Sequence, residues 1–104
     1  MKKAKYRIEL SDDAELDFDQ SYKYYAKESK QLAQKFYNEV NDSFHKITEN
    51  PESQPIADFD TRKYVLKKFP FVVYYMIRLC IIRVIAIFHS SRNPEVWKNR
   101  NTEK

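Results

Sequence analysis

The chain has 104 residues, a length typical of a single domain, and we expect residues 1–104 to form one. Hydrophobic residues make up 42% and charged residues 33%, which is the balance of a folded protein and not of a disordered one. Glycine is absent, which excludes the glycine-rich loops that bind phosphates and dinucleotides. The single cysteine, Cys80, excludes an internal disulfide and a multi-cysteine zinc site, and its apolar neighbours predict a buried, unreactive thiol.

The net charge of +4 is unevenly distributed along the chain. Residues 11–60 carry five Lys or Arg against twelve Asp or Glu, whereas residues 61–104 carry ten against two. Such a positive segment favours an anionic partner, either a nucleic acid or an acidic polypeptide. The basic start of the chain is not followed by an apolar segment, so we expect no signal peptide and a cytoplasmic protein.

The first half of the chain is typical of a short strand followed by two antiparallel helices. Apolar and polar residues alternate in residues 5–10, as in a half-buried strand. Ser11 and the acids after it are typical of a helix start, and helical spacing continues to about residue 30. A second helix is expected from about residue 30 to 50, where Pro51 ends it. The apolar stripes of the two helices are Ala14, Phe18, Tyr22, Tyr25 and Ala26, and Ala33, Phe36, Tyr37, Val40, Phe44 and Ile47.

The second half is rich in strand-forming residues. Residues 51–61 are expected to form a loop and residues 62–68 a strand. Residues 71–88 contain only two charged residues, and their length approaches that of a membrane span. However, two arginines cancel most of the free energy of insertion, and the β-branched and aromatic residues favour strands. We therefore predict a β-hairpin that bends around residues 78–80, although this bend lacks the Gly, Asn or Asp that tight turns favour.

The predicted order is strand, helix, helix, strand, strand, strand, with a helical turn opened by Pro94 near the C-terminus. This order defines an α+β fold in which a helical hairpin packs on one side of a small sheet. On the strand of residues 62–68, Lys63 and Lys67 would share one face. Arg62 and Lys68 would share the other, so some of these cations must line a rim or groove that suits a polyanion or a protein.

Three residues near the C-terminus have both a functional and a structural interpretation. His89 suits acid–base chemistry at neutral pH, or hydrogen bonding within the turn after the last strand. Arg92 and Arg100 suit the binding of phosphate or carboxylate groups, or pairing with acids of the helical half such as Asp17 or Asp19.

The aromatic residues are expected mainly in the core. Trp97 either stacks on a base or anchors its segment on the core. Tyr74 and Tyr75 point to opposite faces of a strand, so at least one of them is expected in the core. The first helix carries a tyrosine cluster that is expected to pack between helix and sheet, namely Tyr22, Tyr24 and Tyr25. No metal-site spacing is present, and we expect neither a metal nor a cofactor.

The order of elements, the FPF step at residues 69–71 and the ending AIFHSSRNPEVWKNR resemble the RelE/ParE superfamily of toxins from bacterial type II toxin–antitoxin modules. The matching features run from Tyr6 to Arg100, and the most specific is the pattern H-x-x-R-x-P-x-x-W-x-x-R that begins at His89. The resemblance implies a two-helix hairpin packed on a twisted antiparallel sheet. It also implies a cognate antitoxin that wraps the toxin and blocks its action.

Two modes of toxicity divide this superfamily. RelE-like members cut mRNA in the ribosomal A site, with basic residues and often a tyrosine near the C-terminus. ParE-like members bind DNA gyrase, turn it into a DNA-damaging complex and have no cleavage chemistry. Alignment of the ending places Trp97 where the nucleases carry the tyrosine, and Ser91, next to Arg92, where they carry an arginine. Because an indole cannot act as acid or base, the resemblance favours the ParE-like branch.

Two alternatives to a gyrase-binding toxin stay open. One is a metal-independent endoribonuclease with the candidate catalytic residues His89, Arg92 and Arg62. The other is a non-toxic remnant that still binds its antitoxin. The expected partners are the antitoxin and either gyrase or the ribosome with its mRNA, and no membrane is expected. The residues expected to bind a partner or polyanion are Arg62, Lys63, Lys67, Arg83, Arg92, Trp97 and Arg100.

Overall fold

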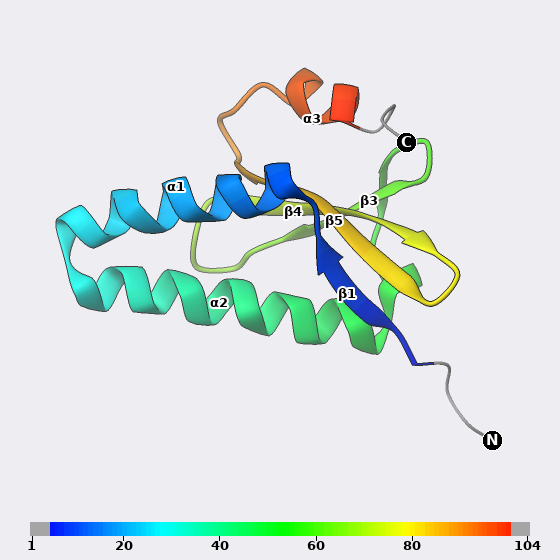
Figure 1. Cartoon of the computed structure of the whole chain (residues 1–104), viewed down its shortest axis with the longest axis horizontal. Coiled ribbons are helices and arrows are strands. Elements are labelled where there is room, and N and C mark those ends of the chain that lie inside the picture. The colour runs from blue at the N-terminus through cyan, green and yellow to red at the C-terminus, as the bar shows by residue number, and fades with distance from the viewer. Residues whose placement is uncertain (1–4, 101–104) are drawn as a thin grey trace.

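In the computed structural model, which describes residues 5–100, five strands form one sheet and two long helices pack beside it (Figure 1). In chain order the elements are β1 (Arg7–Leu10), α1 (Asp12–Glu28), α2 (Lys30–Glu49), the 3-10 helix η1 (Pro51–Ser53), β2 (Ile56–Asp58), β3 (Thr61–Val65), β4 (Phe71–Arg78), β5 (Ile81–His89) and α3 (Glu95–Arg100). The α+β fold is confirmed. Residues 1–4, on which the expectation of no signal peptide partly rests, lie outside the described residues.

Serine residues begin both long helices and account for the turn between them. The Ser11 side chain accepts a hydrogen bond from the Ala14 N–H (3.1 Å), and three acids follow at the positive end of the α1 dipole. Ser29 closes α1 by donating its N–H to the Tyr25 carbonyl (3.0 Å). Its side chain then accepts from the Leu32 N–H (2.9 Å) at the start of α2. One residue thus ends one helix and caps the next, which is why the turn needs neither glycine nor proline.

The strand order across the sheet is β1-β5-β4-β3-β2. The pairs within β2 to β5 are antiparallel, but β1 pairs with β5 in parallel, with Ile8 opposite Ile82. The expectation of an antiparallel sheet is therefore wrong for this pair. The direction of β1 relative to β5 depends on the path of the helical hairpin between them, which local sequence patterns do not reveal.

Two further differences lie in the segment between α2 and β4. The expected loop contains η1 and the short strand β2, which pairs with β3 through Ile56 and Arg62. The strand β3 ends at Val65, so Lys67 and Lys68 lie in the loop before β4 and not on a strand. The predicted alternation of four cations across two strand faces is therefore wrong. The Leu66 N–H donates to the Phe71 carbonyl (2.9 Å) and closes the loop, and Pro70 within it has no N–H to donate to a strand ladder.

The apolar tract forms the predicted hairpin of β4 and β5. Arg78 lies opposite Ile81, which leaves Leu79 and Cys80 as the turn. Leu79 has φ 56°, a left-handed conformation that usually favours glycine or asparagine. Cys80 is exposed, so the expectation of a buried thiol is wrong, because its apolar neighbours belong to the strands and the turn projects beyond the core. No helix within residues 5–100 is long and apolar enough to cross a membrane.

Hydrophobic residues pack on both faces of the sheet. On the face covered by the long helices, Phe36 of α2 is fully buried and contacts the rings of Phe18, Tyr25 and Phe71. A second cluster forms around Trp97 of α3. It contains residues of β4 that alternate with those of the first cluster, so α3 covers the opposite face.

The tyrosines confirm the predicted alternation in β4 but not the predicted packing of α1. Tyr75 is fully buried in the helix-side cluster, and Tyr74 packs with the cluster around Trp97. Tyr25 contacts the core, whereas Tyr24 is 64% exposed, so the expectation that Tyr24 packs between helix and sheet is wrong. Consecutive helix residues lie about 100° apart, and Tyr24 falls outside the buried stripe.

Candidate partner-binding surfaces

A buried carboxylate of α1 holds the C-terminal segment against the sheet. Asp17 is 5% exposed, and its Oδ2 accepts hydrogen bonds from the Ile87 N–H (3.0 Å) and from Nη1 of Arg100 (2.8 Å). Its Oδ1 accepts from Nη2 of Arg100 (3.2 Å). Arg100 also donates to the Ile85 carbonyl (2.9 Å). The guanidinium of Arg100 is therefore engaged inside the protein, as the structural interpretation expects.

Arg92 joins the same cluster but stays partly open to solvent. Its Nη1 lies 3.5 Å from Oδ1 of Asp17, and its guanidinium carbon lies 3.9 Å from the centre of the Phe88 ring. The Arg92 side chain is nevertheless 43% exposed. It thus keeps donor capacity for a carboxylate or phosphate from outside, which Arg100, at 15%, largely lacks.

His89 is the last residue of β5 and organises the turn that follows it. Its Nδ1 accepts a hydrogen bond from the Ser91 N–H (3.1 Å) and lies 2.8 Å from Oγ of Ser91. The imidazole also packs edge-on against Phe71, with 5.2 Å between ring centres. The side chain lines a shallow cavity of about 440 Å³ beside α1, together with Tyr24 and Tyr25. The turn contact expected in the structural interpretation is present, and the histidine is also accessible.

Trp97 is anchored on the core. It is 1% exposed and stacks on Tyr74, with ring centres 4.2 Å apart and an angle of 25° between the planes. Its Nε1 is buried without a hydrogen-bond partner among the described residues. The ring faces that a nucleic acid base would stack on are thus already covered in this structure.

Arg62 ties the segment after α2 to the sheet. Its Nη1 donates to the carbonyls of Glu52 (3.1 Å) and Gln54 (2.6 Å). Beside it, the Tyr75 hydroxyl donates to the Pro51 carbonyl (2.6 Å). Burial raises the pKa of Tyr75 to about 12, although the nearby Arg62 charge acts in the opposite direction. Tyr75 therefore stays protonated at neutral pH and serves as a hydrogen-bond donor.

The structure does not bring the candidate catalytic residues together. Arg62 is the second residue of β3, next to the β2–β3 turn, whereas His89 is the last residue of β5 and lies opposite Phe71, the first residue of β4. The two side chains therefore occupy opposite ends of the sheet. Only His89 and Arg92 are neighbours, because the Arg92 N–H donates to the His89 carbonyl (2.9 Å).

The remaining predicted cations lie on different elements. Lys63 is half-buried on β3 opposite Tyr74, whereas Lys67 is exposed in the loop before β4. Arg83 on β5 is 48% exposed and lies 3.8 Å from Glu9 of β1. Within residues 5–100, no group of three or more His, Cys, Asp or Glu side chains is placed to hold a metal ion.

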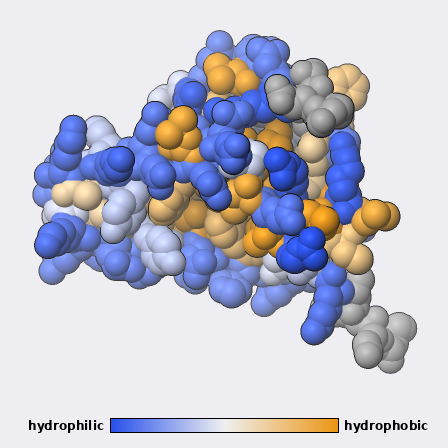
Figure 2. Space-filling model, viewed as in Figure 1, coloured by the Kyte–Doolittle hydropathy of each residue, from blue (hydrophilic) through white to orange (hydrophobic). Residues whose placement is uncertain are grey.

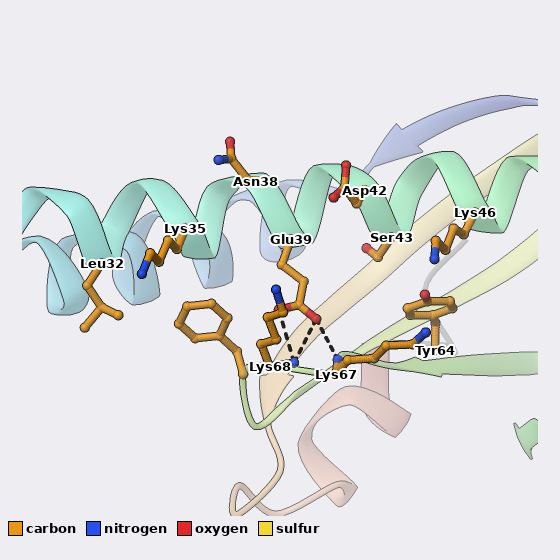
Figure 3. A pocket seen from close by; sticks show the side chains of 11 residues that line it. Leu32, Lys35, Asn38, Glu39, Asp42, Ser43, Lys46, Tyr64, Lys67 and Lys68 are labelled. Atoms are coloured by element: carbon orange, nitrogen blue, oxygen red, sulfur yellow. Dashed lines mark hydrogen bonds between the residues drawn. The ribbon is translucent and has the colours of Figure 1, made fainter.

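A pocket of about 560 Å³ that was not predicted from the sequence lies between α2 and the loop before β4 (Figure 3). Glu39 of α2 reaches across it and accepts hydrogen bonds from the backbone N–H groups of Lys67 (2.6 Å) and Lys68 (2.9 Å). Lys35 and Lys46 line the pocket from α2, so four lysines meet two acids there. Glu39 could be recognised in the sequence as a charged residue on the exposed face of α2. Its hydrogen bond to the Lys67 N–H, however, joins residues 28 apart in the chain, and such a long-range contact has no local sequence signal.

Comparisons with known proteins identify the family. A family model for the ParE toxin of the type II toxin–antitoxin system parDE matches residues 8–94. A search of the curated proteins finds no match. A solved structure described as the chromosomal ParDE toxin–antitoxin system from P. aeruginosa shares the fold, with a TM-score of 0.74 and 15% identity over 84% of this chain and 98% of that one. Since the family model spans most of the chain, the protein belongs to the ParE toxin family of type II toxin–antitoxin systems.

Proposed function

We propose that this ParE-family protein inhibits growth by binding DNA gyrase and is neutralised by a cognate antitoxin. The family match over residues 8–94 is the observation that carries the proposal. The resemblance to ParE-like toxins implies a protein that acts through a binding surface and not through bond cleavage. Its partners are then two proteins, the target and the antitoxin.

The arrangement of the nuclease candidates supports a binding mode. RNA cleavage without a metal needs a base, an acid and cations around one phosphate. Here Arg62 is engaged with two backbone carbonyls at the far end of the sheet from His89. Trp97, which stands where the nucleases carry a tyrosine, is buried. A binding toxin requires none of these groups to converge.

The gyrase proposal is tested with purified protein. The protein is expected to inhibit DNA supercoiling by gyrase and to leave ribosome-bound mRNA intact. Addition of the antitoxin is expected to restore supercoiling. Unchanged gyrase activity at a large molar excess of the protein would contradict the proposal.

We propose that the antitoxin binds in the pocket between α2 and the loop before β4. This surface is concave and carries exposed lysines, so an acidic, extended segment fits it (Figure 3). Replacing Lys67 and Lys68 together by Glu is expected to weaken antitoxin binding at least tenfold, as measured by calorimetry. The matched control is Lys23→Glu on the exposed side of α1, which should leave the affinity unchanged.

An mRNA interferase is the second candidate, because His89 and Arg92 are neighbours in one exposed turn. Primer extension on translated mRNA after induction would then show cuts at fixed codon positions. His89→Ala and Arg92→Ala should abolish these cuts, whereas His45→Ala, at the other histidine, which is exposed on α2, should not. Normal growth on expression without an antitoxin would instead identify a non-toxic remnant.

A further inference from the structure

Two tight turns project from one end of the sheet. The β2–β3 turn consists of Phe59 and Asp60, between the paired residues Asp58 and Thr61. The β4–β5 turn consists of Leu79 and Cys80. Figure 1 shows both turns at the end of the molecule that lies away from the α1–α2 turn.

The two turns are also linked to each other. Asp60 and Arg78 form an ion pair of 3.0 Å, which joins the β2–β3 turn to the last residue of β4. The strands that carry the turns are adjacent, with Thr61 opposite Met76. The turns therefore form one surface, which we call the sheet end.

Each turn contains one residue in a strained conformation. Phe59 has φ 49° and Leu79 has φ 56°, and no other residue among those described has a positive φ. In this region the side chain of an L-residue crowds the following carbonyl oxygen, so hairpins place Gly, Asn or Asp there. A bulky residue at such a position is an outlier that points to a role beyond folding.

The same two side chains are the most exposed large hydrophobic residues described. Phe59 is 88% exposed and Leu79 is 95% exposed, so neither gains from burial within the protein. In the view of Figure 2, hydrophobic residues reach the surface towards the sheet end, whereas the tip of the helical hairpin is mostly hydrophilic. Strain and exposure thus coincide at two neighbouring positions, where a polar turn residue would suit the isolated fold better.

We propose that the sheet end is the surface by which the toxin binds its target, with Phe59 and Leu79 inserted into an apolar cleft of that protein. The inference rests on the proposed function, because it names the contact surface for the same target. Two nearly fully exposed side chains on projecting turns fit a concave receptor, and a large folded enzyme offers such clefts. An antitoxin that wraps the toxin as an extended chain is better matched by the concave pocket along α2.

The charges around the sheet end indicate which charges the rim of the target's cleft should carry. Arg7 is 69% exposed, Arg78 57% and Arg83 48%, whereas the acids that face them are Glu9 and Asp60. Arg7 adjoins the turn directly, because its N–H donates to the Cys80 carbonyl (2.8 Å). The excess of arginine fits a cleft with carboxylates at its edge.

The test uses substitutions that relieve the strain while removing the hydrophobic side chains. Phe59→Asn and Leu79→Asn suit a positive φ, so each is expected to raise the melting temperature by about 4 °C or more. The concentration of each variant that halves gyrase supercoiling is also expected to be at least tenfold higher than that of the wild-type protein. Antitoxin affinity should not change. Leu79→Gly provides a second variant at the same position, and Leu16→Gln, at an exposed leucine of α1, should retain full inhibition.

The outcomes separate this inference from the proposed function. Full inhibition by both asparagine variants would overturn the inference, as would a parallel loss of antitoxin binding. If the wild-type protein arrests growth without inhibiting gyrase, the proposed target is wrong, and the growth arrest caused by the variants then decides the role of the sheet end. If the wild-type protein does neither, both proposals fail.

Discussion

Asp17 joins three parts of the chain through one carboxylate, namely α1, the C-terminal half of β5 and the C-terminal helix α3. In Asp17→Asn, the guanidinium of Arg100 loses the negative charge that it is paired with. Removing one partner of a buried ion pair lowers the stability by about 3–5 kcal/mol. We expect the free energy of unfolding, measured by urea denaturation, to fall by about 3 kcal/mol. Asp19→Asn is the matched control on the exposed side of α1 and should change it by less than about 0.5 kcal/mol.

Tyr75 gives the stability of the protein an alkaline limit. Its pKa in the folded protein is about 12, against an ordinary value of 10, so the folded state keeps a proton that the unfolded chain releases. The resulting stabilisation is complete below pH 10 and is lost as the pH rises to about 12. Unfolding experiments across this range should show a loss on the order of 2 kcal/mol that is reduced in Tyr75→Phe. An identical pH profile for the variant would contradict this assignment.

Individual residues also show where sequence reasoning reaches its limit. By residue type alone, Asp17 and Asp19 are equally plausible partners of the arginines. Only Asp17 lies three residues after the buried Ala14, on the core-facing side of α1. Helical phase alone would have selected it. The burial of Trp97 on Tyr74 depends on how α3 returns to the sheet, and the sequence leaves its role open.

At the level of elements, Glu39 fixes the loop before β4 to α2. The Glu39 carboxylate accepts hydrogen bonds from the backbone N–H groups of Lys67 and Lys68. Glu39→Gln replaces it by a neutral amide, and hydrogen bonds to a charged acceptor are stronger than those to a neutral one. We expect faster hydrogen exchange at these two amides and a loss of about 1 kcal/mol in stability. Asp42→Asn, one turn further along α2 in the same pocket, should leave both amides unchanged.

Elements that are marked by residues close to them in the sequence were predicted, whereas elements that depend on distant residues were not. The N-cap Ser11, the proline at position 51 that stops α2 and the apolar stripes all lie within the helices or next to them, so both helices were expected at nearly their observed bounds. The strand β2 has three residues and follows Pro55, which gives too little alternation to recognise. The direction of β1 and the contact of Glu39 depend on residues far away in the chain.

On the scale of the whole molecule, the sheet has a hydrophobic cluster on each face, and α3 is the main cover of one of them. Trp97→Ala would leave a large cavity over Tyr74, and such truncations cost about 3–5 kcal/mol. Thermal unfolding is expected to show a marked fall in melting temperature together with increased binding of a hydrophobic dye. Tyr24→Ala removes an exposed ring of α1 and should have little effect on either measurement.

The exposed thiol of Cys80 makes the tip of the β4–β5 hairpin chemically unique, because the chain has no other cysteine. A maleimide dye or crosslinker will attach there alone, beside Leu79, and can report contact at that tip directly. Purification without a reductant is expected to join two molecules through this sulfur, tip to tip. Such a covalent dimer would cover the residues beside the thiol, so oxidised preparations should be weaker inhibitors until a reductant is added.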